Sequence, residues 1–311
     1  MRAIVVRKFA ATPEVAEMPV PEPGPRAVRV QLEAAGVNPY DQKMADGILD
    51  GVLPHDFPMI LGIDGAGIIS SVGPEVSRFA VGDRVVGKFL TPPAGHGSFA
   101  EYSVLPEDAT LVRIPDAIPS IAAAALPTAG GTAQDLVDAA KIEPDHTVLI
   151  VGATGGVGSF LVQLANTAGA HVIATARGEA ADRMTRLGAA ETVDYSAGPL
   201  RAQLAAAYPD GIDILFDLVS SPEALADLTG LVHDGGIVYS TVGAVDEDRL
   251  RARDMRGGNL QSSGRAPELA RLLGRVADGD VVVPIDATIP LTEGLSVIGA
   301  TGARGKTVLT I

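Results

Sequence analysis

Short apolar runs alternate with stretches of helical spacing through the middle of the chain. Strands are predicted near residues 147–151, 171–176, 191–194, 212–217 and 236–240. Helices are predicted between them, near residues 156–168, 179–187, 199–207 and 221–230. Because strand and helix alternate repeatedly, this α/β region predicts a parallel sheet covered by helices on both faces. The glycine-rich, polar segment 254–264 predicts a mobile loop.

Before residue 120 the pattern is mostly that of β-structure. Short strand patterns occupy residues 27–34, 59–69, 81–87 and 97–104. Asn38 followed by Pro39 is typical of a helix N-terminus, so a short helix is predicted over 38–46. Several short strands separated by turns predict a compact, barrel-like β-module.

The tail of the chain differs again from the alternating region. Apolar residues at helical spacing predict a helix over 267–278. A strand is expected over 281–286, a helix over 291–300 and a final strand over 306–311. The character of the sequence therefore changes near residue 120 and again near residue 267.

A glycine-rich turn joins the first strand of the alternating region to its helix. The strict Gly-x-Gly-x-x-Gly pattern is absent, and Ala153 lies among the glycines at 152, 155, 156 and 158. A turn of this kind lets the backbone approach a pyrophosphate, whose charge then lies at the N-terminus of the following helix. The alternative is a tight turn that binds nothing. The turn residues predicted to hold a dinucleotide are Gly152, Ala153, Thr154, Gly155, Gly156, Val157 and Gly158.

The amino-acid composition excludes several kinds of site and disfavours one class of partner. The 311 residues include no cysteine and carry a formal net charge of −14. The lack of cysteine excludes disulfides, thiolate catalysis and thiolate-bound zinc, and the acidic balance disfavours binding to nucleic acid. No apolar run reaches the length of about 18 residues that spans a bilayer, and the N-terminus begins directly as a strand. We therefore expect a cytoplasmic protein of two domains.

Eight short motifs lie along nearly the whole chain, at 36–41, 61–67, 81–87, 97–102, 126–132, 152–158, 187–190 and 303–309. In this order they resemble the medium-chain dehydrogenase/reductase superfamily, in particular its zinc-independent, quinone oxidoreductase-like branch. The resemblance implies a GroES-like β-barrel domain (1–119 and 267–311) and an inserted Rossmann domain (120–266). It also implies catalysis in a cleft between the domains and a homodimer.

The chain departs from the zinc-dependent relatives of this family. Those enzymes carry a cysteine at or beside the position of Asn38, and Gly-His-Glu where this chain has Gly62, Ile63 and Asp64. The five histidines show no metal-ligand spacing. A catalytic zinc would lack its ligands, so we predict no metal.

The second strand of the alternating region indicates the cofactor. Folds that prefer NAD place an acidic residue near the end of this strand to hold the ribose hydroxyls. Residues 174–178 contain no carboxylate, whereas Arg177 offers a guanidinium suited to a phosphate. The resemblance adds Tyr195, a position whose ring often lies near the adenosine 2′-phosphate. Arg177 as an ordinary solvated charge and Glu179 as an acidic rival are the alternatives, and NADPH is predicted over NADH.

The expected lack of a metal restricts the hydride acceptor. Reduction of a simple ketone needs strong stabilisation of an alkoxide, whereas a quinone or an α,β-unsaturated carbonyl spreads the developing charge, which hydrogen-bond donors in a dry cleft can hold. A conjugated acceptor is therefore expected. The catalytic candidates are Asn38 and Tyr40, which face the cleft in relatives, and Thr132, which matches a threonine near the nicotinamide carboxamide. Asn38 is equally well explained as a helix cap.

The ends of later strands supply further cofactor-binding candidates. Val219 follows one strand, and Val242 and Gly243 follow the next, at the carboxyl edge where ligands bind in such sheets. Asn259, in the polar segment 254–264, is a further candidate.

Three charged residues and two rival functions remain. Asp41 and Asp64 match acidic positions of the family and are expected to make structural hydrogen bonds, and Lys306 is expected to pair with a carboxylate. No residue stands out as an obligatory general acid. The rivals to an NADPH-dependent quinone or enone reductase are an enoyl-thioester reductase and a non-catalytic NADPH-binding redox sensor.

Overall fold

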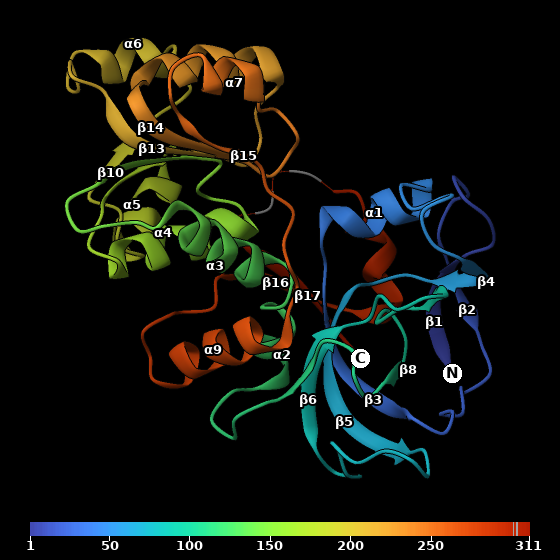
Figure 1. Ribbon diagram of the computed structural model, residues 1–311. Helices are drawn as coiled ribbons and strands as arrows, with labels where there is room; N and C mark the ends of the chain where they lie inside the picture. The colour runs from blue at the N-terminus through green and yellow to red at the C-terminus, as the bar shows by residue number, and fades with distance from the viewer. Residues whose placement is uncertain (301, 303) are drawn as a thin grey trace. The chain divides into compact units, whose positions relative to one another are not determined.

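The structure is a computed structural model that describes residues 1–300, 302 and 304–311. Thr301 and Ala303, the latter the first residue of the 303–309 motif, lie outside the described residues. The chain forms two compact units, Met1–Gly131 with Gly264–Ile311, and Thr132–Ser263 (Figure 1). The sequence places the boundaries at 119/120 and 266/267. The first boundary lies later in the structure than in the prediction, because helix α2 (Ser120–Ala124) packs on β3 and β5 of the first unit.

The first unit is built on two sheets. The larger has seven strands in the order β16-β17-β3-β5-β6-β9, with β8 paired to β3, and the smaller has the order β2-β1-β4-β7. The strands of the larger sheet are β3 (Ala27–Gly36), β5 (Asp64–Val72), β6 (Arg84–Lys88), β8 (Tyr102–Pro106), β9 (Leu111–Arg113), β16 (Ile285–Pro290) and β17 (Lys306–Thr310). Those of the smaller are β1 (Arg2–Val6), β2 (Glu14–Glu17), β4 (His55–Ile60) and β7 (Ala94–His96). The C-terminal strand β17 pairs with β3, so the two ends of the chain share this unit.

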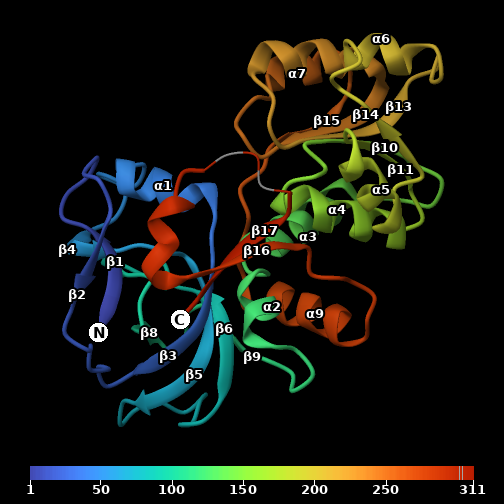
Figure 2. The ribbon, with the colours of Figure 1, turned by 180° about the vertical axis from the view of Figure 1, so that it is seen from behind.

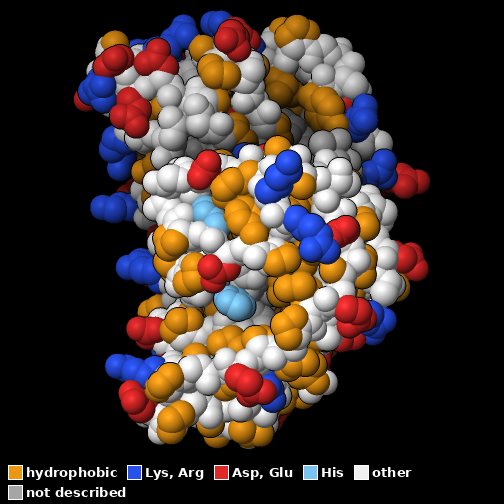
Figure 3. All heavy atoms as spheres, turned by 90° about the vertical axis from the view of Figure 1, so that its right-hand side faces the viewer, with side chains coloured by type: hydrophobic (Ala, Val, Ile, Leu, Met, Phe, Trp, Pro, Cys, Tyr) orange, Lys and Arg blue, Asp and Glu red, His pale blue; other side chains and the backbone are white. Residues whose placement is uncertain are grey.

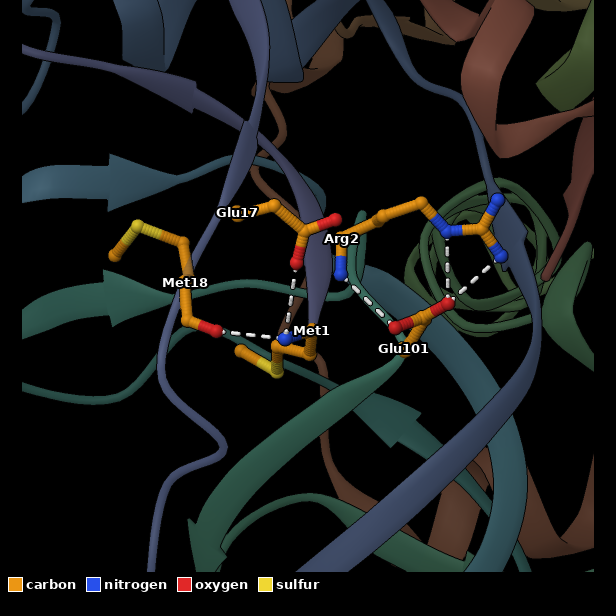
Figure 4. Close-up of polar contacts among 5 residues, drawn as sticks. All are labelled: Met1, Arg2, Glu17, Met18 and Glu101. Carbon is orange, nitrogen blue, oxygen red and sulfur yellow. Dashed lines mark hydrogen bonds and ion pairs between the residues drawn. The ribbon is translucent and has the colours of Figure 1, made fainter.

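Ion pairs hold the N-terminus against this unit (Figure 4). The Met1 ammonium donates to the Met18 carbonyl at 2.7 Å and lies 3.4 Å from Glu17 Oε2. The Arg2 backbone N–H and guanidinium both donate to the Glu101 carboxylate at 2.8–2.9 Å. The backbone N–H and then the guanidinium of Arg2 lower the pKa of Glu101. These contacts hold β1 against the segments that carry Glu17, Met18 and Glu101.

The second unit is a six-stranded parallel sheet. Its strand order, β12-β11-β10-β13-β14-β15, is the 3-2-1-4-5-6 order of dinucleotide-binding folds. The strands are β10 (Thr147–Val151), β11 (His171–Thr175), β12 (Glu191–Val193), β13 (Ile212–Asp217), β14 (Val232–Ser240) and β15 (Arg256–Asn259). The helices are α3 (Ala129–Ala140), α4 (Gly156–Thr167), α5 (Glu179–Arg186), α6 (Leu200–Ala205), α7 (Pro222–Leu228) and α8 (Glu247–Arg251). Figures 1 and 2 show α6 and α7 over one face and α3, α4 and α5 over the other, which confirms the α/β prediction.

Three local predictions differ most from the structure. The segment expected as a mobile loop contains β15, which needs no apolar side chains because its backbone pairs with β14. The strand expected over 281–286 begins instead at Ile285, where exposed and half-buried positions alternate on β16. The helix expected over 291–300 is a short 3₁₀ helix, Leu291–Ser296. Helix α9 (Ala266–Ala277) matches its prediction over 267–278 and buries Leu269, Leu272 and Leu273.

The first unit also exposes apolar side chains around α1 (Pro39–Asp46) and the segment that follows it. Ile48, Val52 and Phe57 are exposed, and Phe57 packs edge-on against Phe9 with ring centroids 5.1 Å apart. Figure 3 shows hydrophobic side chains gathered between charged ones on one face of the protein. Among the described residues, no helix combines the length and the apolar character needed to cross a bilayer.

Candidate functional site

The glycine-rich turn between β10 and α4 is closed tightly on itself. Gly152 adopts a left-handed conformation, with φ of 85°. A Cβ on Gly158 would lie 2.4 Å from the Gly152 carbonyl oxygen, so no other residue fits there without a backbone shift. Gly155 occupies the N-cap of α4 and has no side chain to cap it. The first-turn N–H groups of α4 are therefore available to an anion.

Two neighbours hold this turn in place. Thr175, at the end of β11, accepts a hydrogen bond from the Gly152 N–H at 3.0 Å and donates one to the Ile150 carbonyl at 3.2 Å. Val219 approaches from the end of β13, and its Cγ1 would lie 2.9 Å from a Cβ on Gly152. Sequence reasoning missed Thr175, because an unremarkable strand threonine gives no signal of its partner across the sheet.

Arg177 and Tyr195 lie together just beyond the ends of β11 and β12. The guanidinium carbon is 5.5 Å from the centroid of the tyrosine ring, and both side chains are exposed. The Ser196 hydroxyl and backbone N–H lower the pKa of Asp194, and the Arg177 charge lowers it further. The pair thus presents a cation stacked on an aromatic face beside one carboxylate.

The carboxyl ends of β13 and β14 are cross-linked by a buried acid. The fully buried Asp217 accepts hydrogen bonds from the Ser220 N–H at 3.0 Å and the Ser240 hydroxyl at 2.9 Å. Val219 and Val242, which follow the two strands, are 65% and 45% exposed, unusual values for valine. The buried acid therefore shapes two loops that display apolar side chains.

Two other predicted cofactor-binding residues lie near these loops. Gly243 adopts φ of 81°, and nothing lies within 4 Å of where a Cβ would stand. The Asn259 side chain is bonded to the backbone of Val245 on both sides, with its Oδ1 accepting at 2.9 Å and its Nδ2 donating at 3.1 Å. Asn259 therefore braces the loop between β14 and α8, and its contact with a cofactor stays a prediction.

In the first unit, Asn38 occupies the N-cap position of α1, as the helix-cap alternative expected. The Asp41 carboxylate accepts the Asn38 backbone N–H at 2.7 Å, as in a capping box. The Asn38 amide nitrogen donates to Asp64 Oδ2 at 3.0 Å and to the Gly36 carbonyl at 3.2 Å. Its oxygen accepts from the Lys306 ammonium at 2.6 Å. Both amide hydrogens of this 4% exposed side chain are thus committed within the protein.

The two acidic residues beside Asn38 are fully buried. Asp64 accepts hydrogen bonds from the Thr128 N–H at 3.0 Å and the Thr128 hydroxyl at 2.7 Å. Asp41 accepts one from the Ile63 N–H at 3.1 Å, and burial, aided by the charge of Asp64, raises its pKa to about 7. Burial lowers the pKa of Lys306, and the two carboxylates oppose that effect. The structural hydrogen bonding expected for both acids is therefore present.

The other catalytic candidates lie in different units. Tyr40 is half-buried in the first turn of α1, and burial raises its pKa. Thr132 is the first residue of the second unit and lies buried on α3. Ile63, at the position of a zinc-ligand histidine in relatives, packs in the apolar core. Within the part of the chain that the structure describes, no three His, Cys, Asp or Glu residues are grouped to hold a metal.

Comparisons with known proteins agree with this geometry. The family profile described as "Alcohol dehydrogenase GroES-like domain" matches residues 24–116, and the one described as "Zinc-binding dehydrogenase" matches residues 156–264. A chloroplast envelope quinone oxidoreductase homolog of Arabidopsis thaliana is 40% identical over 192 residues, which is 60% of this chain and 57% of that protein. A trans-enoyl reductase of Aspergillus japonicus is 33% identical over 215 residues, 65% of this chain and 61% of that one. The matches thus span less than two thirds of the length of these relatives.

Solved structures extend the similarity to the full chain. The quinone oxidoreductase from Coxiella burnetii superposes with a TM-score of 0.87 at 25% identity, covering 100% of this chain and 99% of that one. A structure described as an NAD-dependent alcohol dehydrogenase gives a TM-score of 0.87 at 31% identity, with both chains covered completely.

Proposed function

The chain belongs to the medium-chain dehydrogenase/reductase superfamily, and on that premise we propose that it is an NADPH-dependent oxidoreductase that transfers a hydride to a quinone or an α,β-unsaturated carbonyl without a metal. The observation that carries the proposal is the stacking of Arg177 on Tyr195 at the carboxyl edge of the parallel sheet. A guanidinium fixed there suits a 2′-phosphate, whereas NAD-preferring folds place a carboxylate at the end of the second strand.

The residues of the second unit fit such a cofactor. The uncapped first turn of α4 suits a pyrophosphate, and the compact turn leaves no side chain in the way. Exposed Val219 and Val242 offer apolar surface to a flat ring at the carboxyl edge. The negative charge of Asp194 opposes a phosphate there, but its carboxylate already accepts the Ser196 hydroxyl and N–H.

A bound NADPH supplies the hydride, and the protein has to hold the oxygen anion that forms on the acceptor. Since burial raises the pKa of Tyr40, its phenol remains protonated at neutral pH and can donate a hydrogen bond. The Asn38 amide is less available, because its hydrogens are bonded to Asp64 and Gly36. Tyr40 is therefore our preferred donor in the acceptor site.

Assembly and location belong to the same proposal. We propose a homodimer, supported by the outer edge of β15, which pairs with no other strand among the described residues and could add a strand from a second copy. A cytoplasmic location stays a prediction, since the Arabidopsis relative is described as a chloroplast envelope protein.

An enoyl-thioester reductase is the alternative, and it is favoured by the similarity to a trans-enoyl reductase. The formal charge of −14 argues against a strongly anionic acceptor. A non-catalytic NADPH-binding sensor would share the second unit with either enzyme. The three functions differ in what happens to an acceptor, so turnover separates them.

The test is a panel of quinones, enones and enoyl thioesters, each offered with NADPH and with NADH. We expect turnover of 1,4-benzoquinone or 9,10-phenanthrenequinone with NADPH and clearly slower turnover with NADH. Faster reduction of an enoyl thioester would establish the alternative. Tight NADPH binding without reduction of any acceptor would leave only the sensor.

A further inference from the structure

A cluster of three buried charges lies inside the first unit. Its members are the fully buried Asp41 and Asp64 and the nearly buried Lys306. They come from the first turn of α1, the start of β5 and the start of β17, and Lys306 is 268 residues from the Asn38 side chain that it contacts. Burying charges in this way is costly unless each is paired and hydrogen-bonded, so the cluster calls for an explanation.

Asn38 is the residue that joins the three charges. Its backbone N–H bonds to Asp41, its amide nitrogen bonds to Asp64, and its amide oxygen accepts from Lys306. The amide can satisfy these partners in one orientation only, because a flip would point its N–H groups at the ammonium and its oxygen at a carboxylate. The Lys306 ammonium is itself anchored on the Val37 carbonyl at 2.8 Å.

The charges in the cluster do not balance. Two ionised carboxylates and one ammonium leave a net charge of −1 in a buried site. A proton on Asp41 removes this excess, in keeping with its pKa of about 7. The charged groups that act on Asp41 are Asp64, which raises its pKa, and Lys306, which lowers it. Lys306 therefore fixes the orientation of the Asn38 amide, and its charge opposes the rise in the pKa of Asp41.

We infer that Lys306 is a positioning residue for the acceptor site: it fixes the Asn38 amide and thereby the 38–41 turn that carries Tyr40. The inference rests on the proposed function, since it takes Tyr40 to contact the acceptor. Lys306 touches neither reactant in this account. It acts through Asn38 by holding the turn in one conformation, and its charge favours the ionised form of Asp41.

Turnover of three variants tests the inference. Lys306→Met should lower kcat with the best quinone by about 10- to 100-fold, the effect expected of a misplaced donor. The NADPH dissociation constant should stay within about twofold, because the hydrogen-bond partners of Lys306, Val37 and Asn38, are not predicted cofactor residues. Lys306→Arg should recover part of kcat, since it keeps the charge. Lys43→Met is the matched control, because Lys43 is an exposed lysine on the same helix as Asp41. An unchanged kcat in Lys306→Met would overturn the inference.

A titration of the Asp41 carboxyl carbon by NMR tests the charge coupling without turnover. We expect a midpoint near 7 in the wild type and in Lys43→Met. Loss of the cation should raise this midpoint in Lys306→Met, with Lys306→Arg close to wild type. The Asn38 side-chain amide signals should follow the same titration. If Lys306→Met does not fold, Lys306→Arg must still lower kcat while keeping the midpoint, since a longer, planar guanidinium does not reproduce the geometry of the ammonium at its two acceptors.

The two proposals fail in different ways. A wild type that reduces no acceptor defeats the proposed function, and the Asp41 midpoints then still decide whether Lys306 controls the cluster. A wild type that is active, with equal Asp41 midpoints in wild type and Lys306→Met, defeats only the inference.

Discussion

Removal of the Arg177 guanidinium is the sharpest test of the cofactor assignment. The side chain is exposed and stacks on Tyr195 at 5.5 Å, and its substitution leaves no cavity. Arg177→Ala should therefore leave the fold intact and change only the recognition of a 2′-phosphate. NADH lacks that phosphate, so its Michaelis constant serves as an internal reference.

The size of the effect follows from the exposure of the site. A hydrogen bond to a charged group contributes about 1.5–3 kcal/mol, and an exposed site favours the lower part of that range because solvent screens the charges. A loss of about 1.5–2 kcal/mol corresponds to a roughly 10- to 30-fold rise in the Michaelis constant for NADPH. Tyr195→Phe keeps the ring and should change it by less than about threefold.

The assay is steady-state oxidation of NADPH and NADH with a fixed quinone, in the wild type, Arg177→Ala and Arg186→Ala. Arg186 is an exposed arginine on α5 and controls for a general change in surface charge. Equal rises for both cofactors, or the same rise in Arg186→Ala, would refute the assignment of Arg177 to the phosphate.

Three further predictions concern the second unit. In Gly158→Ala the new Cβ would lie 2.4 Å from a backbone oxygen, so thermal unfolding without cofactor should show a loss of about 1–3 kcal/mol in the free energy of unfolding. In the control Gly155→Ala the nearest atom to the new Cβ is 3.5 Å away, and the loss should be under about 1 kcal/mol. Asp217→Ala leaves two backbone N–H groups and a buried hydroxyl without their acceptor, and denaturant unfolding should show a loss of about 3 kcal/mol; a loss below about 0.5 kcal/mol would contradict this. Hydrogen bonds to the Asp234 carbonyl and to the Asp213 carboxylate raise the pKa of His233. The stability that protonated His233 gives the fold is therefore full below its ordinary pKa of about 6.5 and is lost as the pH rises through the raised value. The loss of stability in His233→Asn should be greater near pH 5.5 than near pH 8.5, by less than about 1 kcal/mol because the pair is exposed.

The alternating half of the fold was predictable because its strands are buried on both faces. β10, β11 and β13 each contain an uninterrupted apolar run (148–151, 172–174 and 214–216), and such runs stand out between amphipathic helices. β15 was not predictable, since its sequence Arg-Gly-Gly-Asn carries no apolar signal. Its strand conformation is set by backbone pairing with β14, which a pattern of side chains does not record.

The same distinction between local patterns and contacts distant in sequence applies to the candidate cofactor and acceptor residues. Local chemistry predicted the turn at 152–158 and the cation Arg177, because a glycine turn and a missing carboxylate are visible in a short window. The stacking partner Tyr195 came from a family resemblance, and the structure brings the two side chains together. The link between Lys306 and Asn38 crosses nearly the whole chain, so no local pattern contains it.

Asn38 shows why residue type alone could not decide its role. An amide donates and accepts equally well, so cap and catalytic donor were both consistent with the sequence. The structure places it at the cap position but gives its oxygen to Lys306 and its hydrogens to Asp64 and Gly36. An amide that already hydrogen-bonds to three partners has no free hydrogen to donate to an anion on the acceptor. Its inferred role is therefore to hold the turn that carries Tyr40.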